Sequence, residues 1–187
     1  MSQALPGLNS PAVGFEVPLE MLAACHGRVQ HQCATLLRLM AHLRAHGCDQ
    51  PAQEAASAIV RYFDSAARHH HEDEEHDLFP ALLDSMAGSD AVCLRDLTAA
   101  LRKDHRALER QWGVLRPQLL KISEAASDAI DADVAQSFVQ LYETHIGREE
   151  AELLPMAARL LTDAELDRIG AAMRTRRGVP APVDPQP

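Results

Sequence analysis

The chain has 187 residues, a formal charge of -9, 47% hydrophobic residues and only 4% aromatic residues. This length allows one domain with a single core, and the negative charge excludes a general electrostatic attraction to nucleic acid or to an anionic membrane surface. Because Ala and Leu dominate and runs of β-branched or aromatic residues are missing, the composition predicts an all-α protein.

From the hydrophobic pattern we expect no membrane span and no signal peptide. No stretch approaches the roughly 18 apolar residues that cross a bilayer, and the N-terminus lacks the basic-then-apolar order of a secretory leader. We therefore expect a cytoplasmic protein with small-molecule partners, and its alanine-rich helix faces permit a homodimer without requiring one. The cysteines have no C-x-x-C spacing, so we expect reduced thiols rather than metal ligands: Cys25, Cys33, Cys48 and Cys93.

Residues 1–17 contain prolines and glycines without a helical period and predict an N-terminal arm. From Pro18 to Gly47, apolar residues recur at steps of three and four, which predicts a first long helix. His26 lies inside the apolar stripe of this helix.

The second predicted helix has a stripe that continues from apolar residues into His70 and Glu74. After a loop near residues 87–90, a third stripe occupies residues 94–119, and His105 is its only titratable member. Each of these helices therefore places a potential metal ligand among apolar side chains.

The fourth stripe follows a turn at residues 127–133 and contains His145 and Glu149. Thr162, with Glu165 three residues later, predicts the N-cap of a short fifth helix. We divide the chain into an arm, a helical bundle and a disordered Pro-rich tail, at residues 1–17, 18–176 and 177–187.

The chain repeats itself after 75 residues. Two segments align without a gap: His70-x-x-x-Glu74-Glu75-x-x-Leu78-Phe79-Pro80 and His145-x-x-x-Glu149-Glu150-x-x-Leu153-Leu154-Pro155. His26 and His105 take equivalent places upstream. The repeat predicts two helical hairpins related by a pseudo-twofold axis, each with its lone histidine opposite its own His/Glu pair. Pro80 and Pro155 are expected to end or kink their helices.

Histidine and glutamate four residues apart on a helix can aim an imidazole and a carboxylate at one point. Two such pairs occur, on stripes that hold no Lys or Arg, so a cation is the simplest compensation for burying the carboxylates. Six ligands are too many for one tetrahedral zinc ion, and mixed imidazole and carboxylate ligands suit iron or manganese. We expect two non-haem iron ions, bridged by both carboxylates and an oxo or hydroxo group, with manganese or zinc as alternatives.

Three further histidines surround the first motif: His69, His71 and His76. We interpret them as lining a solvated helix face, although His71 with Glu75 is the rival register for the metal-binding pair. Glu75 and Glu150 are either acceptors that orient imidazoles or surface charges. Tyr142, one turn before His145, either donates to a bound oxygen species or packs in the core.

The two motifs, His70-His71-x-x-Glu74-Glu75-x-x-Leu78-Phe79-Pro80 and His145-Ile146-x-x-Glu149-Glu150, resemble those of the hemerythrin-like, or HHE, cation-binding domains. The resemblance covers about residues 18–160 and implies an up-down-up-down four-helix bundle. It also implies a set of six metal ligands: His26, His70, Glu74, His105, His145 and Glu149. Oxygen-carrying hemerythrins hold five histidines unevenly on their two irons, whereas this sequence offers four symmetrically. The set looks closer to bacterial iron-sulfur repair and nitric-oxide-responsive di-iron proteins.

Three functional hypotheses follow. In the first, the two-iron centre binds or senses oxygen, nitric oxide or peroxide, with a role in iron handling or iron-sulfur cluster repair under oxidative or nitrosative stress. In the second, the same centre turns over as a ferroxidase or peroxidase, for which Tyr142 is the one redox-active candidate nearby. In the third, the bundle holds at most one structural metal and serves in association with other molecules.

Overall fold

The computed structural model describes residues 14–85 and 90–180, and within these ranges the chain is helical with no strand. Residues 1–13, most of the predicted arm, lie outside the described residues, as do 181–187 of the predicted tail and most of the loop expected near 87–90. The elements are α1 (Pro18–His46), α2 (Gln50–Asp64), α3 (Ala66–Asp73), η1 (Glu74–Leu78), α4 (Phe79–Asp84), α5 (Asp90–Ser123), α6 (Ala132–Arg148), η2 (Glu149–Leu153), α7 (Leu154–Leu160) and α8 (Asp163–Arg176).

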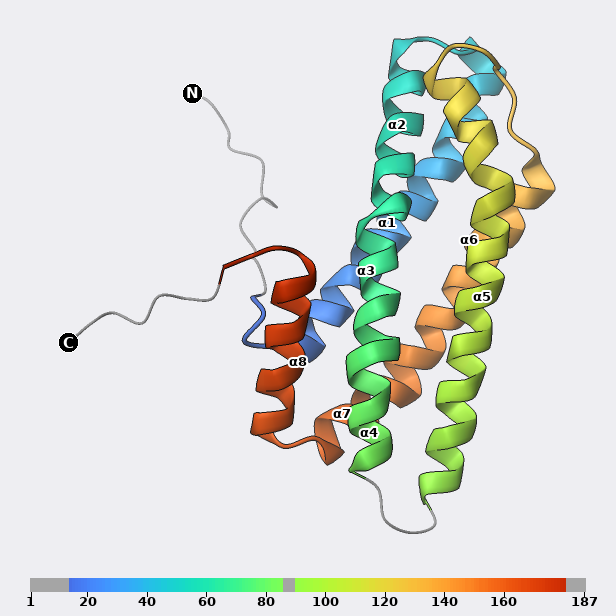
Figure 1. Ribbon diagram of the computed structural model, residues 1–187. Coiled ribbons are helices and arrows are strands. Elements are labelled where there is room, and N and C mark those ends of the chain that lie inside the picture. Colours follow the sequence, from blue (N-terminus) through green and yellow to red (C-terminus); the bar gives the residue numbers. More distant parts are fainter. Residues whose placement is uncertain (1–13, 86–89, 181–187) are drawn as a thin grey trace, which may run out of the picture.

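These elements form four long rods, since α2, α3, η1 and α4 follow one another along one line, as do α6, η2 and α7 (Figure 1). Neighbouring rods run in opposite directions, and α8 packs outside the bundle against α1 and α3. The predicted fold, an up-down-up-down four-helix bundle with a short fifth helix, is confirmed. None of the helices in the described part of the chain is long and apolar enough to cross a membrane.

The helix ends follow from local sequence. Pro18 occupies the first turn of α1, and Gly47 ends that helix with a φ of 75°, a conformation that glycine adopts without strain. The Asp49 side chain accepts from the backbone N–H of Ala52 and caps α2. The predicted capping box of α8 is present, with Thr162 as the N-cap residue.

The second and fourth rods contain a π-helical turn that begins at the glutamate of each His/Glu pair. The backbone N–H of Phe79 donates to the carbonyl of Glu74, and that of Leu154 donates to the carbonyl of Glu149. Pro80 and Pro155 follow, and neither has an N–H to continue an α-helical ladder. The wider turn accommodates each proline and the rod continues, so the expectation that the prolines end their helices is wrong.

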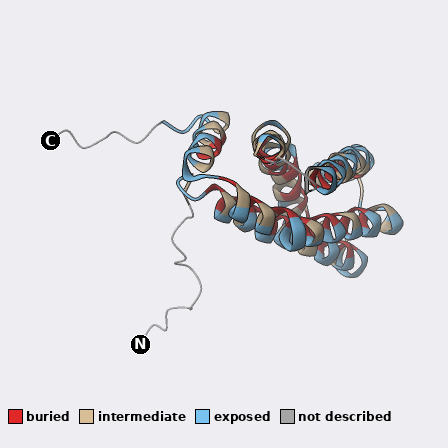
Figure 2. Cartoon of the chain, turned by 90° about the horizontal axis from the view of Figure 1, so that it is seen from below, coloured by how far each residue is buried: buried red, intermediate tan, exposed pale blue. Residues whose placement is uncertain are grey.

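Two hydrophobic clusters fill the bundle, one towards each end. The larger includes Leu36, Ile59, Leu115 and Phe138, and the other includes Leu22, Phe79 and Leu101. Figure 2 shows that buried residues face the interior of the bundle. A band of buried histidines and glutamates separates the two clusters.

The four cysteines are free thiols, as predicted. Cys25 and Cys33 are buried, and burial raises the pKa of Cys33 to about 12. Cys48 is half-buried and Cys93 is exposed. Among the described residues, the groups that could hold a metal contain no cysteine.

Candidate metal centre

The buried polar band contains all six residues that the sequence singled out. We call them the His/Glu cluster: His26 from α1, His70 from α3, Glu74 from η1, His105 from α5, His145 from α6 and Glu149 from η2. Each side chain is at most 2% exposed. Every one of the four rods therefore contributes at least one imidazole to a common interior point.

The four imidazoles form two pairs. The rings of His26 and His70 meet edge to face with centroids 4.9 Å apart, and those of His105 and His145 do the same at 4.7 Å. Each pair belongs to one hairpin, as the repeat predicted.

The two glutamates stand between these imidazole pairs. Glu74 and Glu149 offer ligand atoms within 4.8 Å of those of His26 and His70, and equally of those of His105 and His145. Two groups of close ligand atoms, each able to hold a cation, thus share both carboxylates.

The carboxylates cross between hairpins. Glu149 of the second hairpin places Oε2 3.1 Å from His26 Nε2 of the first, and Glu74 of the first places Oε2 3.2 Å from His105 Nε2 of the second. We expected each lone histidine to face the His/Glu pair of its own hairpin. This is confirmed for the histidine of each pair, but the carboxylate contacts of His26 and His105 come from the glutamate of the other hairpin. The reason is that every rod of a four-helix bundle has two neighbours: α1 packs on α6 as well as α2, and α5 packs on α2 as well as α6.

Glu75 and Glu150 orient the two lone histidines. His105 Nδ1 donates to Glu75 Oε1 at 2.7 Å, and His26 Nδ1 donates to Glu150 Oε1 at 3.3 Å. A carboxylate can only accept, so Nδ1 carries a proton in each ring, and the neutral form of the ring keeps the lone pair of Nε2 towards the cluster. This is the arrangement by which carboxylates position metal-ligating histidines in other proteins.

Unpaired polar atoms concentrate in this one place. Eleven buried side-chain nitrogen or oxygen atoms of the described residues have no hydrogen-bond partner, and ten of them belong to the His/Glu cluster and to His71. Both oxygens of Glu74 and of Glu149 are among them. Buried polar groups are normally satisfied, so the concentration fits a site built to receive cations.

The pKa shifts of the metal-free cluster also fit a cation-binding site. Burial and the nearby Glu149 raise the pKa of Glu74 to about 7. Burial acts on Glu149 in the same direction, yet the charge of His145 and the close approach of His105 hold the pKa of Glu149 well below its ordinary value. Burial also opposes charge on His105, but its contacts with the two glutamates raise the pKa of His105 to about 10. Partial protonation of Glu74 and a positive charge on His105 thus offset the negative charge that a cation would otherwise neutralise.

His71 does not line a solvated face, which corrects the sequence interpretation. Its ring stacks on that of His105 with centroids 4.0 Å apart, and it lies 5.7 Å from the ring of His145. Burial, followed by the charge of His105, lowers the pKa of His71 well below its ordinary value. Of the other two histidines in the run, His69 is half-buried and His76 is exposed.

The two rival registers for the metal-binding pair were His70 with Glu74 and His71 with Glu75, and the structure gives their members different places. His70 and Glu74 lie in the cluster, whereas Glu75 is 25% exposed and turns to His105 from outside. His71 reaches the cluster as well. Consecutive residues on a helix point about 100° apart, so a strict stripe leaves one of them out. His70 and His71 nevertheless both reach the cluster, because they belong to two different groups of close ligand atoms.

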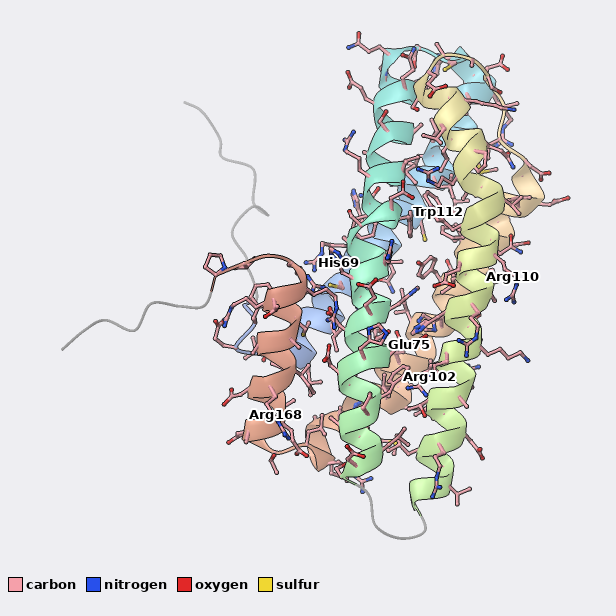
Figure 3. All side chains as sticks on the ribbon, in the orientation of Figure 1. His69, Glu75, Arg102, Arg110, Trp112 and Arg168 are labelled. Atoms are coloured by element: carbon pink, nitrogen blue, oxygen red, sulfur yellow. The ribbon has the colours of Figure 1, made fainter. Side chains whose placement is uncertain are left out.

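A cavity of about 570 Å³ lies beside the cluster and is lined by residues of α2, α3, η1, α5 and α6. Phe63, His71, Trp112 and Tyr142 line it, together with charged residues at its rim. Figure 3 shows Trp112 and Glu75 on this side of the bundle, in the space between the two rods. Tyr142 packs against the rings of Phe63 and Phe138 at 5.4 and 5.1 Å, which favours the packing interpretation of this tyrosine.

Comparison with known proteins adds two findings. The family model described as the hemerythrin HHE cation binding domain matches residues 17–157. A protein of Haemophilus influenzae described as uncharacterized is 35% identical over 162 residues, which is 87% of this chain and 91% of that protein. The range matched by the family model, residues 17–157, contains all six residues of the His/Glu cluster and His71.

Proposed function

The chain belongs to the hemerythrin HHE cation-binding family and is a metal-binding protein, and on this premise we propose that it holds two non-haem iron ions and binds oxygen, nitric oxide or peroxide there. The observation that carries the proposal is the pair of buried carboxylates shared by two imidazole pairs. A two-iron pair would supply redox chemistry and an open coordination position for a small ligand.

The ligands divide between the ions in this proposal. His26 and His70 hold one ion, His105 and His145 hold the other, and the two glutamates are shared, as the two groups of close ligand atoms suggest. Two carboxylates neutralise only part of the charge of two divalent cations. The remaining positive charge favours anionic ligands and those that become anionic on reduction.

The protein's own residues prepare the site for this role. Glu75 and Glu150 hold two imidazoles with Nε2 towards the ions. The two hydrophobic clusters exclude water from above and below, which strengthens the electrostatic interactions of the buried carboxylates. A role in iron handling or iron-sulfur repair under nitrosative stress is consistent with such a centre.

The cavity beside the cluster supports a second candidate, a two-iron oxidoreductase. Its volume of about 570 Å³ is large for a diatomic molecule and falls in the range of small-molecule binding sites. Substrate turnover by a ferroxidase or peroxidase would use such a space. The first candidate ranks higher because the shared carboxylates and oriented imidazoles support metal binding directly, while no residue of the cavity identifies a substrate.

The test is elemental analysis of anaerobically purified protein, followed by ultraviolet-visible spectra before and after exposure to air and to nitric oxide. We expect about two irons per chain and reversible spectral change. Both should be lost in Glu149→Ala. A metal content below one per chain in the wild type, or zinc retained in Glu149→Ala, would contradict the proposal. Catalytic consumption of peroxide with an electron donor would favour the oxidoreductase.

A further inference from the structure

We propose that His71 is an additional metal ligand, which joins His105 and His145 on one ion and makes the centre unequal. The inference rests on the two-ion centre proposed above. One ion would take three imidazoles and the other two, while both share the glutamates. The sequence repeat alone suggests two equivalent ions.

The first argument is position. The ligand atoms of His71, His105 and His145 all lie within 4.8 Å of one another. Two of these three residues already form one of the two imidazole pairs of the His/Glu cluster. The additional imidazole therefore falls on the side of one ion and not of the other.

The second argument is an unsatisfied atom. His71 Nε2 is buried and has no hydrogen-bond partner, which is unusual for a buried ring nitrogen. Binding a cation would satisfy this atom.

The third argument concerns the room that His71 has to move. Its ring is stacked within 14° of parallel on His105, whereas two imidazoles bound side by side on one ion cannot remain stacked face to face. The His71 ring must turn, and its Nε2 loses no hydrogen bond when it does. The ring also forms part of the cavity wall, so one side of it is open to free space.

The fourth argument is the matching position in the second half. The 75-residue repeat aligns His71 with Ile146, which is 2% exposed and packs in the larger hydrophobic cluster. The second half therefore has no imidazole to offer there. The ion with three imidazoles has one position fewer for an outside ligand, so that ligand binds the ion of His26 and His70.

The experiment replaces His71 in the full chain and measures metal binding. His71→Ile copies the residue of the second half, His71→Gln is a polar second variant, and His76→Gln on the same rod is the matched control, since His76 is exposed. Cobalt(II) titration gives the two affinities, and Mössbauer spectra of iron-57-loaded protein report each ion separately.

We expect two distinct iron sites in the wild type and in His76→Gln. Both His71 variants should weaken one cobalt affinity at least about tenfold and change one iron signal, with the other unaltered. Circular dichroism of the metal-free variants checks that they fold. Unchanged affinities and iron signals in either folded His71 variant would overturn the inference, as would changes that occur only after nitric oxide is added, because His71 would then face the bound ligand. A wild type without two bound ions would overturn the proposed function itself.

Discussion

The two halves of the bundle carry the same metal-binding motif but anchor it differently. In the first half, Asp73 lies between the histidine and the glutamate of the motif, is fully buried and pairs with Arg176, the last residue of α8, and with Arg177, which follows that helix. In the second half the matching residue is Arg148, which is partly exposed and donates to Asp104 of α5 at 2.7 Å. The charge at this position is reversed between the halves. The partner also differs: it lies at the end of α8 in the first half and in α5 in the second.

The difference separates what the centre requires from what merely supports it. Both halves keep the histidine, the glutamate, the π-turn and the proline, because these place ligands at a common point. The residue that ties the helix to its neighbour can be of either charge, provided that its partner is opposite. We call each such charged pairing an anchor. The anchor of the first half joins Asp73 to Arg176 and Arg177, and these two arginines lie beyond the region matched by the family model.

The largest expected effect concerns the feature that the halves share. Glu74 and Glu149 each belong to both groups of ligand atoms, so replacing either with glutamine should reduce bound metal from about two ions to below one per chain. His26→Ala should remove about one ion. Elemental analysis after anaerobic loading measures this, with Glu152→Gln as an exposed control in the same π-turn. Two ions retained in Glu149→Gln would show that the carboxylate is not shared.

The anchor of the first half gives the next effect. Replacing Arg176 and Arg177 with alanine would leave Asp73 buried without a partner, and breaking a buried ion pair in this way costs about 3 to 5 kcal/mol. The free energy of unfolding of the metal-free protein in urea measures the loss. Arg168→Ala, at a strongly exposed position of the same helix, should leave it unchanged. A double variant as stable as the wild type would mean that Asp73 finds another partner.

The bundle itself was predictable because its signal is spread over many residues. Apolar residues three and four apart indicated four helices, and the break in that pattern by His26, His70, His105 and His145 indicated the polar band. The 75-residue repeat placed the two glutamates. These features depend on local periodicity, which a sequence shows directly.

Three features were not predictable in this way, because each depends on which rods become neighbours. The contact of Glu149 with His26 joins residues more than a hundred positions apart. The pairing of Asp73 with α8 requires the docking of a helix whose own sequence shows no partner. His71 reaches the cluster because the bundle closes over it from α5 and α6. The π-turns had a local signal in Pro80, but a proline alone does not distinguish a kink from a wider turn.

The hydrogen bonds that the Nδ1 atoms of His105 and His26 donate to Glu75 and Glu150 differ in length and exposure. We therefore expect the loss of these two glutamates to weaken metal affinity by different amounts. Glu75 is 2.7 Å from His105 and 25% exposed, whereas Glu150 is 3.3 Å from His26 and 48% exposed. Glu75→Ala should weaken metal binding about 10- to 100-fold, and Glu150→Ala by less, because a longer and more exposed hydrogen bond orients its imidazole less firmly. Competition with a chelator measures both. Glu75→Gln retains an acceptor and should recover part of the loss. An equal loss in the two alanine variants would mean that the distances do not govern orientation.

The smallest effect should come from the anchor of the second half. Asp104 and Arg148 are 22% and 32% exposed, and ion pairs of this exposure contribute less than about 1 kcal/mol to stability. Asp104→Asn should therefore change the free energy of unfolding far less than the loss of Arg176 and Arg177. Added salt should shrink the effect of Asp104→Asn further, because salt screens exposed charges much more than buried ones. Asp104 also lies 3.8 Å from His145 Nδ1, too far for a hydrogen bond, so metal affinity should stay within a few fold. If Asp104→Asn lowered the free energy of unfolding as much as the double arginine variant does, both halves would depend equally on their anchors. The difference in burial between the two anchors would then not affect stability.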